Sequence, residues 1–291
     1  MHYAAKFDIW QPCRYNHDYR FNYKGGVVWI ACNPEKSIGG EELIRRATGI
    51  QLPTVHSLKL EHCPVLDRYV RLVDKMVNGS SNDEGLRRLY LEYSQFYGTT
   101  GKPQYDYGEL QDDLFVGLDD LEELDIRTTD VDETKIMEGA LNGLGKLKML
   151  KLTSNRIKGL PEKLFWPTPR LTSLRLQEKA VPDFPEGLFE KLGDLQRLEI
   201  QVSNARKFHP RLFANLGKLE SLEIRDMSLF DEDSIPRGIF DDLVSMRNFT
   251  LTGNGLEHSP TTLFSNTKLE NFHWSLYRSV LPDAYSQIFR W

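Results

Sequence analysis

Long apolar runs are missing from this chain of 291 residues. No stretch approaches the roughly 20 consecutive apolar residues that a membrane-spanning helix needs, and residues 1–8 lack the apolar core of a signal peptide. The formal net charge of −5, with 27% charged residues, gives none of the basic excess that is typical of nucleic-acid-binding proteins. The sequence therefore predicts no membrane span of its own and no nucleic-acid partner.

Catalytic and metal-binding motifs are lacking as well. The seven histidines are scattered, and no H-E-x-x-H or G-x-S-x-G constellation occurs. The segment most similar to a phosphate loop, residues 139–146, is followed by Leu147 where Ser or Thr is needed. A similar sequence, Asn-Leu-Gly-Lys at 215–218, occupies the same position within a later repeat, which indicates that the segment belongs to the repeat pattern. We therefore expect a non-enzymatic protein with no cofactor and no metal site.

A repeated leucine pattern is what the chain does contain. Its clearest copies begin at Leu147, Leu171, Leu195 and Leu219, so that three consecutive spacings are each 24 residues. Each copy carries the motif L-x-x-L-x-L. A fixed period of about 20 to 29 residues with this motif predicts a leucine-rich-repeat solenoid, whose units bury their apolar faces only by stacking on neighbours.

About nine copies of the repeat are legible. The less regular copies begin at Val55, Leu86, Leu121, Met246 and Leu269. We predict an N-terminal cap over residues 1–54 and repeats over residues 55–291, with the C-terminal end of the stack uncapped.

The spacing within one repeat predicts its local structure. Leu150 and Leu152 are two residues apart and point to the buried side of a short strand, while Lys151 points outward. Strands of successive repeats are expected to pair in parallel on the concave side of a curved horseshoe. On the convex side, Leu164 and Phe165 follow Pro161, and recurring phenylalanines predict an aromatic stack within an irregular or 3₁₀ segment. The expected class is α/β.

The same register predicts the side chains that face a ligand. Their signs alternate along and across the strands, which suits a mixed-charge protein surface better than a polyanion. The alternative is that exposed strand positions are simply polar. The candidates are Arg127, Lys151, Arg175, Arg197, Glu199, Glu223 and Arg225.

One long, irregular repeat contains an aromatic insertion between residues 94 and 110. Tyr97, Tyr105 and Tyr107 are candidates for an interface loop, because tyrosine offers a large contact area with a polar tip. Packing against the Tyr-rich cap is the alternative.

Two N-x-[ST] sequons are present, at Asn78 and Asn248. Asn78 lies in a polar, turn-rich loop and would be accessible to glycosylation in a secreted chain. Asn248 is expected to project from a concave strand, where a glycan would block that stretch from protein ligands.

Cysteine is scarce, with three residues in the chain. Cys13 and Cys32 bracket a Tyr-rich segment upstream of the first repeat. A disulfide between them would favour an oxidising compartment, whereas two reduced core thiols are the alternative. Cys63, in the first repeat, fits a small buried side chain.

These features together resemble the N-terminal half of an arthropod Toll receptor ectodomain. Three segments carry the resemblance: the cap that contains Cys13 and Cys32 and ends at 28–34, the Cys-bearing first repeat at 55–66, and x-P-x-x-L-F units such as 160–165. The resemblance implies an extracellular receptor ectodomain at the plasma membrane. It also implies a cystine-knot cytokine ligand of the Spätzle type, receptor dimerisation, and signalling through a cytoplasmic TIR domain.

The chain departs from that family in lacking a C-terminal cysteine flank, a transmembrane helix and a TIR region. We therefore expect a fragment, attached to a membrane only through a C-terminal part that this chain does not contain. The alternative function is a secreted or intracellular scaffold or decoy that uses the same solenoid for protein interaction without membrane signalling.

Overall fold

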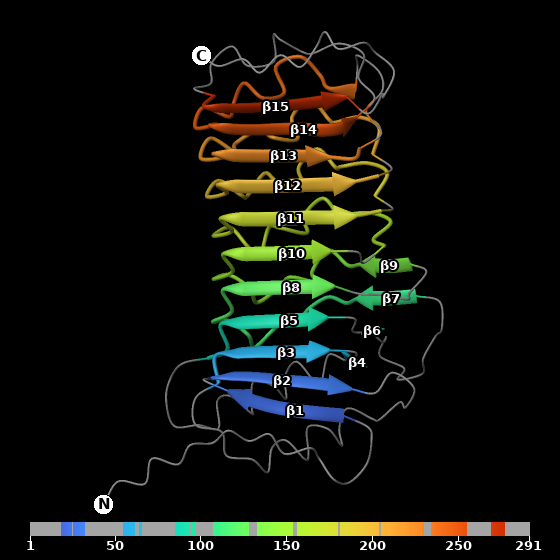
Figure 1. The fold of residues 1–291 in the computed structure, drawn as a ribbon, viewed down its shortest axis with the longest axis vertical. Helices are drawn as coiled ribbons and strands as arrows, with labels where there is room; N and C mark the ends of the chain where they lie inside the picture. Colours follow the sequence, from blue (N-terminus) through green and yellow to red (C-terminus); the bar gives the residue numbers. More distant parts are fainter. Residues whose placement is uncertain are drawn as a thin grey trace, which may run out of the picture.

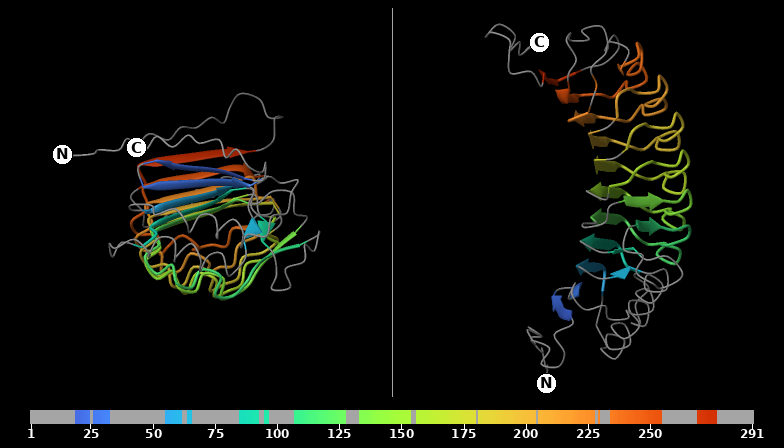
Figure 2. Two further views of the ribbon diagram at one scale, coloured as in Figure 1. Left: turned by 90° about the horizontal axis from the view of Figure 1, so that it is seen from below. Right: turned by 90° about the vertical axis from the view of Figure 1, so that its right-hand side faces the viewer.

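The computed structural model shows a curved stack of short coils whose strands form one long sheet (Figures 1 and 2). It describes residues 19–24, 26–32, 55–61, 64–65, 85–92, 95–96, 107–127, 133–153, 156–179, 181–203, 205–227, 229, 234–254 and 269–276. The sheet lies on the concave side of the curve, and the turns lie on the convex side (Figure 2).

The described residues contain an 11-stranded main sheet. Its strands, in spatial order, are β1 (Tyr19–Lys24), β2 (Val27–Cys32), β3 (Ser57–Glu61), β5 (Arg88–Glu92), β8 (Glu123–Arg127), β10 (Met149–Thr153), β11 (Ser173–Glu178), β12 (Arg197–Val202), β13 (Ser221–Arg225), β14 (Asn248–Asn254) and β15 (Asn271–Leu276). Only β1 runs antiparallel to its neighbour; the other pairings are parallel. The order of these strands follows the sequence, as expected when each repeat adds one strand.

The register of the sheet aligns equivalent leucines of successive repeats. Leu150 pairs with Leu124 on one side and with Leu174 on the other, and Leu198 continues the line. All four side chains are buried. Alternation within each strand therefore separates an apolar inner face from a polar outer face, and the predicted leucine-rich-repeat solenoid is confirmed.

The N-terminal hairpin β1–β2 extends the main sheet. Val28 pairs with Leu58 of β3 and is 1% exposed, so it belongs to the continuous core. Gly26, at the turn of the hairpin, has φ +79° and lies directly against the ring of His56. A β-carbon at Gly26 would collide with that ring, which explains why glycine occupies the turn.

The convex side consists of tight turns, and the described residues contain no α-helix. Trp166 N donates to Lys163 O at 3.0 Å and Thr168 N donates to Phe165 O at 3.1 Å, which is the i→i+3 pattern of 3₁₀ and β-turns. Two small parallel sheets lie outside the main sheet. They pair β4 (Pro64–Val65) with β6 (Gln95–Phe96), and β7 (Tyr107–Leu110) with β9 (Glu133–Ile136).

The predicted phenylalanine stack fills the space between the convex turns. Ring centroids are 6.0 Å apart for Phe165 and Phe189, 6.2 Å for Phe189 and Phe213, and 5.6 Å for Phe213 and Phe240. Leu141 occupies the equivalent place in the repeat of β8 and interrupts the aromatic series on the N-terminal side. The stack therefore joins the repeats of β10, β11, β12 and β13.

Candidate functional site: the concave face

The outward side chains of the main sheet form parallel rows that cross the strands. We call the middle one the central row. It consists of Trp29, Lys59, Tyr90, Asp125, Lys151, Arg175, Glu199, Glu223, Thr250 and His273. Because the pairing is in register, each side chain lies one strand spacing, about 4.8 Å, from the next.

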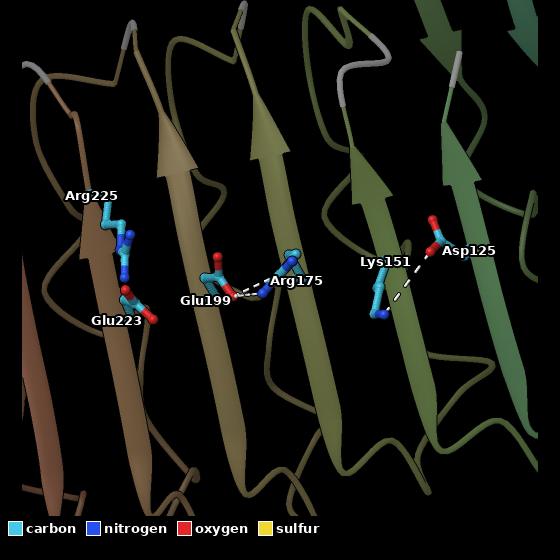
Figure 3. A network of polar contacts seen from close by, with 6 residues as sticks. All are labelled: Asp125, Lys151, Arg175, Glu199, Glu223 and Arg225. Carbon is cyan, nitrogen blue, oxygen red and sulfur yellow. Dashed lines mark hydrogen bonds and ion pairs between the residues drawn. The ribbon is translucent and has the colours of Figure 1, made fainter. Parts of the chain in front are cut away.

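Oppositely charged neighbours in the central row pair across strands (Figure 3). Arg175 Nε and Nη2 lie 2.7 and 2.6 Å from Glu199 Oε2, which joins β11 to β12. Lys151 Nζ lies 4.0 Å from Asp125 Oδ2, which joins β10 to β8. These charges are therefore partly committed to one another before any ligand binds.

Two further ion pairs involve the concave face. Glu223 pairs with Arg225 on the same strand, β13 (Figure 3). Towards the N-terminus, Lys59 Nζ lies 2.8 Å from Glu92 Oε2 and joins β3 to β5. All these groups are partly solvent-exposed, so each pair stabilises the fold by about 1 kcal/mol or less.

The structure separates the seven predicted ligand-facing residues into two groups. Lys151, Arg175, Glu199, Glu223 and Arg225 all belong to the ion pairs described above. Arg127 and Arg197 do not. Arg127 is half-buried and its Nε has no hydrogen-bond partner, whereas Arg197 is exposed and forms no ion pair among the described residues. The register alone did not predict this division, because it depends on the rotamers of long side chains.

Burial shifts two ionisation equilibria near β8. Desolvation raises the pKa of the Asp125 carboxyl, although Lys151 and Arg127 oppose this shift. Desolvation also raises the pKa of the Tyr90 hydroxyl, as does the nearby Glu123 carboxylate, to which Tyr90 donates a hydrogen bond of 3.1 Å. The β5–β8 part of the face therefore contains partly desolvated polar groups.

Trp29 at the N-terminal end was missed as a site residue. Its Nε1 donates to Glu61 Oε2 at 3.0 Å, and Lys59 Nζ lies 5.8 Å from its ring centroid. Trp29 is nevertheless 38% exposed. The alternation Val28, Trp29, Ile30 in a strand next to the repeats was the available signal, because it places Trp29 on the same face as Lys59.

Glu178 was also missed. It is 1% exposed and its Oε2 accepts a hydrogen bond from the backbone N of Ile157 at 3.3 Å. Its even spacing from Leu174 and Leu176 is the signal that places it on the inner face. This carboxylate has a structural role, since it satisfies a buried amide between turns.

The C-terminal part of the concave face is uncharged on its strands. Asn271 Nδ2 donates to Asn248 Oδ1 at 2.7 Å, and Thr250 lies in the central row beside His273. The predicted glycosylation site Asn248 is half-buried and faces outward from β14, as its place in the repeat indicated. Whether it carries a glycan stays a prediction.

The convex side carries an exposed aromatic residue, Trp166. Its side chain is 39% exposed, and Lys163 and Lys191 lie over its ring at 5.2 and 5.0 Å. Both cations come from the chain itself, which leaves little of the ring surface for a partner.

Several predicted residues lie outside the described part of the structure. Cys13, Asn78, Tyr97 and Tyr105 are among them. For Cys32 and Tyr107 the structure gives the backbone, in β2 and β7, but not the side chain. The disulfide, the glycan at Asn78 and the tyrosine loop therefore stay predictions.

The described residues contain no group of three or more His, Cys, Asp or Glu side chains arranged to hold a metal ion. No helix among them has the length and apolarity to cross a bilayer. The described part of the concave face presents hydrogen-bonding groups and paired charges on the outer side of the sheet.

The fold and this face define a parallel-strand solenoid that displays a polar concave sheet. Comparison with protein-family models matches leucine-rich repeats at residues 134–181 and a BspA-type leucine-rich-repeat region at residues 188–287. The chain is therefore a leucine-rich-repeat domain, a fold that typically serves as a non-enzymatic scaffold for protein interactions. A search of curated proteins finds no match.

Solved structures similar to this chain include two leucine-rich-repeat proteins. TLR13 in its complex with ssRNA13 is 18% identical, with a TM-score of 0.54 over 80% of this chain and 33% of TLR13. Internalin C2 of Listeria monocytogenes is also 18% identical, with a TM-score of 0.53 over 80% of this chain and 91% of internalin C2. At this level of identity the likeness shows the fold, and the chain spans a third of the TLR13 chain.

Proposed function

We propose that this chain is the ligand-recognising, N-terminal part of a Toll-type receptor ectodomain and that it binds a protein across the concave face. The observation that carries the proposal is the in-register, mixed-charge surface of β3 to β13, whose cations and carboxylates pair across strands. A surface with both signs interspersed suits a protein partner of complementary pattern. The solenoid likeness to a Toll-like receptor supports the receptor class.

The proposed ligand is a processed cystine-knot cytokine of the Spätzle type, and the proposed location is extracellular. Both rest on the resemblance of the cap, first repeat and convex units to arthropod Toll receptors. Receptor dimerisation through parts beyond this chain belongs to the same proposal.

The second candidate function is a free-standing scaffold or decoy without membrane signalling. It is favoured by one observation: internalin C2 matches over 91% of its own length, so a solenoid of this size can form most of a protein. A cysteine flank and a membrane helix downstream in the full gene would support the receptor, and a stop codon soon after Trp291 would support the scaffold.

The concave site can be tested by exchanging the members of one ion pair. The double variant Arg175→Glu/Glu199→Arg keeps a pair in place and reverses its polarity, so the fold should survive while the charge pattern changes. We expect the Kd for a processed Spätzle-type cytokine, measured by surface plasmon resonance, to rise about tenfold or more.

The matched control is Asp194→Lys/Lys218→Asp. Lys218 Nζ lies 2.7 Å from Asp194 Oδ1, in the turns that precede β12 and β13 and outside the strands themselves. This exchange should leave the Kd unchanged. Equal affinities of the concave variant and the unaltered chain would contradict binding at this face.

The extracellular location has a separate test in mass spectrometry of material secreted from insect cells. We expect a glycan on Asn78 and a Cys13–Cys32 disulfide. An unmodified Asn78 together with free thiols at both cysteines would contradict the extracellular proposal.

A further inference from the structure

We infer that Arg197 binds a carboxylate of the protein that docks on the concave face. This carboxylate belongs to an acidic segment of the partner, which lies across the starts of β11 to β14. The inference rests on the proposed binding of a protein at this face. It adds the chemistry of the contact and the residue that makes it.

Arg197 is the uncommitted cation of the C-terminal half of the face. The described strands β10 to β15 carry four cationic side chains, and three of them, Lys151, Arg175 and Arg225, form ion pairs. Arg197 forms none, and it does not pair with Glu220 in the next repeat. Its side chain is exposed, so its guanidinium is available without breaking an intramolecular contact.

The surroundings of Arg197 keep that guanidinium accessible. Its register partners are Ser173 on β11 and Ser221 on β13, two small side chains that cannot cover it. Glu199, two residues along the same strand, is held by Arg175 on the neighbouring strand. A planar guanidinium in such a place binds a carboxylate through two parallel hydrogen bonds, which fixes both the distance and the orientation of the partner.

The row that contains Arg197 supplies further hydrogen-bonding groups. Ser173 precedes Arg197 in this row, and Ser221, Asn248 and Asn271 follow it in register. The row from β11 to β15 thus has one positive charge, no negative charge, and hydroxyl or amide groups at each other position. An extended acidic segment can place its carboxylate at Arg197 and its backbone polar groups along these side chains.

Charge balance favours a protein segment over RNA. The outward positions of strands β3 to β13 carry seven cations and six carboxylates, and four ion pairs join eight of these thirteen groups to one another. They are Lys59, Arg88, Arg127, Lys151, Arg175, Arg197 and Arg225, and Glu61, Glu92, Glu123, Asp125, Glu199 and Glu223. A bound phosphate backbone needs a continuous track of cations, whereas a single unpaired arginine among paired charges, as Arg197 is on strands β10 to β15, suits one carboxylate.

The test uses random peptides displayed on phage and selected on the complete chain. We expect the selected peptides to be enriched in Asp and Glu. For a synthetic copy of the strongest binder, fluorescence anisotropy should show that Arg197→Gln raises the Kd about tenfold or more, which corresponds to the loss of a charge-assisted bidentate contact. The matched control is Arg170→Gln, which removes an exposed arginine in the turn that precedes Leu171 and should leave the Kd unchanged.

The outcomes distinguish this inference from the proposed function. Binding that is lost with Arg175→Glu/Glu199→Arg but kept with Arg197→Gln overturns the role of Arg197 and leaves the concave site intact. Binding that survives both changes overturns both proposals. Binding of a single-stranded oligouridine probe that depends on Arg197 overturns the assignment of a protein segment as the partner.

Discussion

Phe189 and Phe213 stack with their ring centroids 6.2 Å apart and their planes 14° apart, although 24 residues separate them in the sequence. Both side chains are fully buried. The contact joins the convex sides of two repeats whose strands, β11 and β12, already pair on the concave side. These two repeats are therefore held together at both sides of the coil, by backbone hydrogen bonds between β11 and β12 on one and by aromatic packing on the other.

Replacing Phe189 by Ala should lower the free energy of unfolding by about 3 to 5 kcal/mol, because the change leaves a cavity between Phe165 and Phe213. Urea denaturation followed by far-UV circular dichroism measures this loss. The control Glu190→Ala alters the adjacent exposed residue and should change stability by less than about 0.5 kcal/mol. A loss below about 1 kcal/mol for Phe189→Ala would contradict a structural role of the stack.

Gly253 should not tolerate a side chain. It has φ +70° at an irregularity in β14, and a β-carbon there would overlap Asp226 Oδ1 and lie 3.0 Å from the Asp226 backbone N. We expect Gly253→Ala to destabilise the chain by about 1 to 3 kcal/mol, measured by thermal unfolding. Gly159→Ala is the matched control, since no atom lies within 4 Å of its added β-carbon; it should be neutral or slightly stabilising.

We expect substitutions in the Arg175–Glu199 pair and at the unpaired Arg197 to affect the stability of the fold differently. A double-mutant cycle with Arg175→Ala and Glu199→Ala should give a coupling energy of about 0.2 to 1 kcal/mol that decreases at 1 M salt. Arg197→Ala should change stability by less than about 0.5 kcal/mol and show no coupling to Glu199→Ala. A coupling of Arg197 to Glu199 as large as that of Arg175 would show that Arg197 is not free in solution.

We expect the contribution of Asp125 to the stability of the fold to depend on pH. Because burial raises the pKa of this carboxyl above its ordinary value of 3.8, the group favours the folded state below that value and loses this contribution as the pH rises through its folded-state pKa. Asp125→Asn removes the charge that is unfavourably buried at neutral pH. We expect the variant to be more stable than the unaltered chain at pH 7, with the difference narrowing as the pH falls towards 3.8.

Urea denaturation of both chains across this pH range measures the difference. Asp194→Asn is the control. It removes an exposed member of an ion pair, and it should leave stability unchanged or lower it by about 1 kcal/mol at most. The stability of Asp125→Asn is compared with that of the unaltered chain at each pH. If this difference is less favourable to the variant at pH 7 than at low pH, the burial effect is contradicted.

The leucine period predicted most of the fold, because equivalent residues of successive repeats occupy equivalent positions in the stack. Once Leu150 and Leu174 are known to be equivalent, the outward position of Lys151 and Arg175 follows from strand alternation alone. The convex phenylalanines were predictable in the same way. Leu141 was less apparent, because nothing in a single repeat shows that an aromatic series is interrupted there.

The pairing of charges could not be predicted at the same level. Arg175 and Arg197 are equally polar and equally outward in the sequence, yet Arg175 forms an ion pair with Glu199, whereas Arg197 forms none within the described part of the chain. Arg175 lies on the strand next to that of Glu199, whereas Arg197 lies on the same strand as Glu199. Which arginine pairs with Glu199 depends on this offset and on the side-chain rotamer, and a repeat pattern specifies neither. The inward position of Glu178 was accessible from spacing but contradicts the usual preference of carboxylates for the surface.

The in-register stacking of β10 to β13 also limits how the concave pattern can vary. Since a whole repeat is inserted or removed as a unit, charges on this face move relative to one another only in steps of about 4.8 Å. Removal of residues 173–196 would bring Lys151 beside Glu199, so the sheet would keep an ion pair at that junction while every group beyond it shifts by one step. Changes in repeat number therefore offer this solenoid a way to alter the spacing of its binding groups without altering any single group.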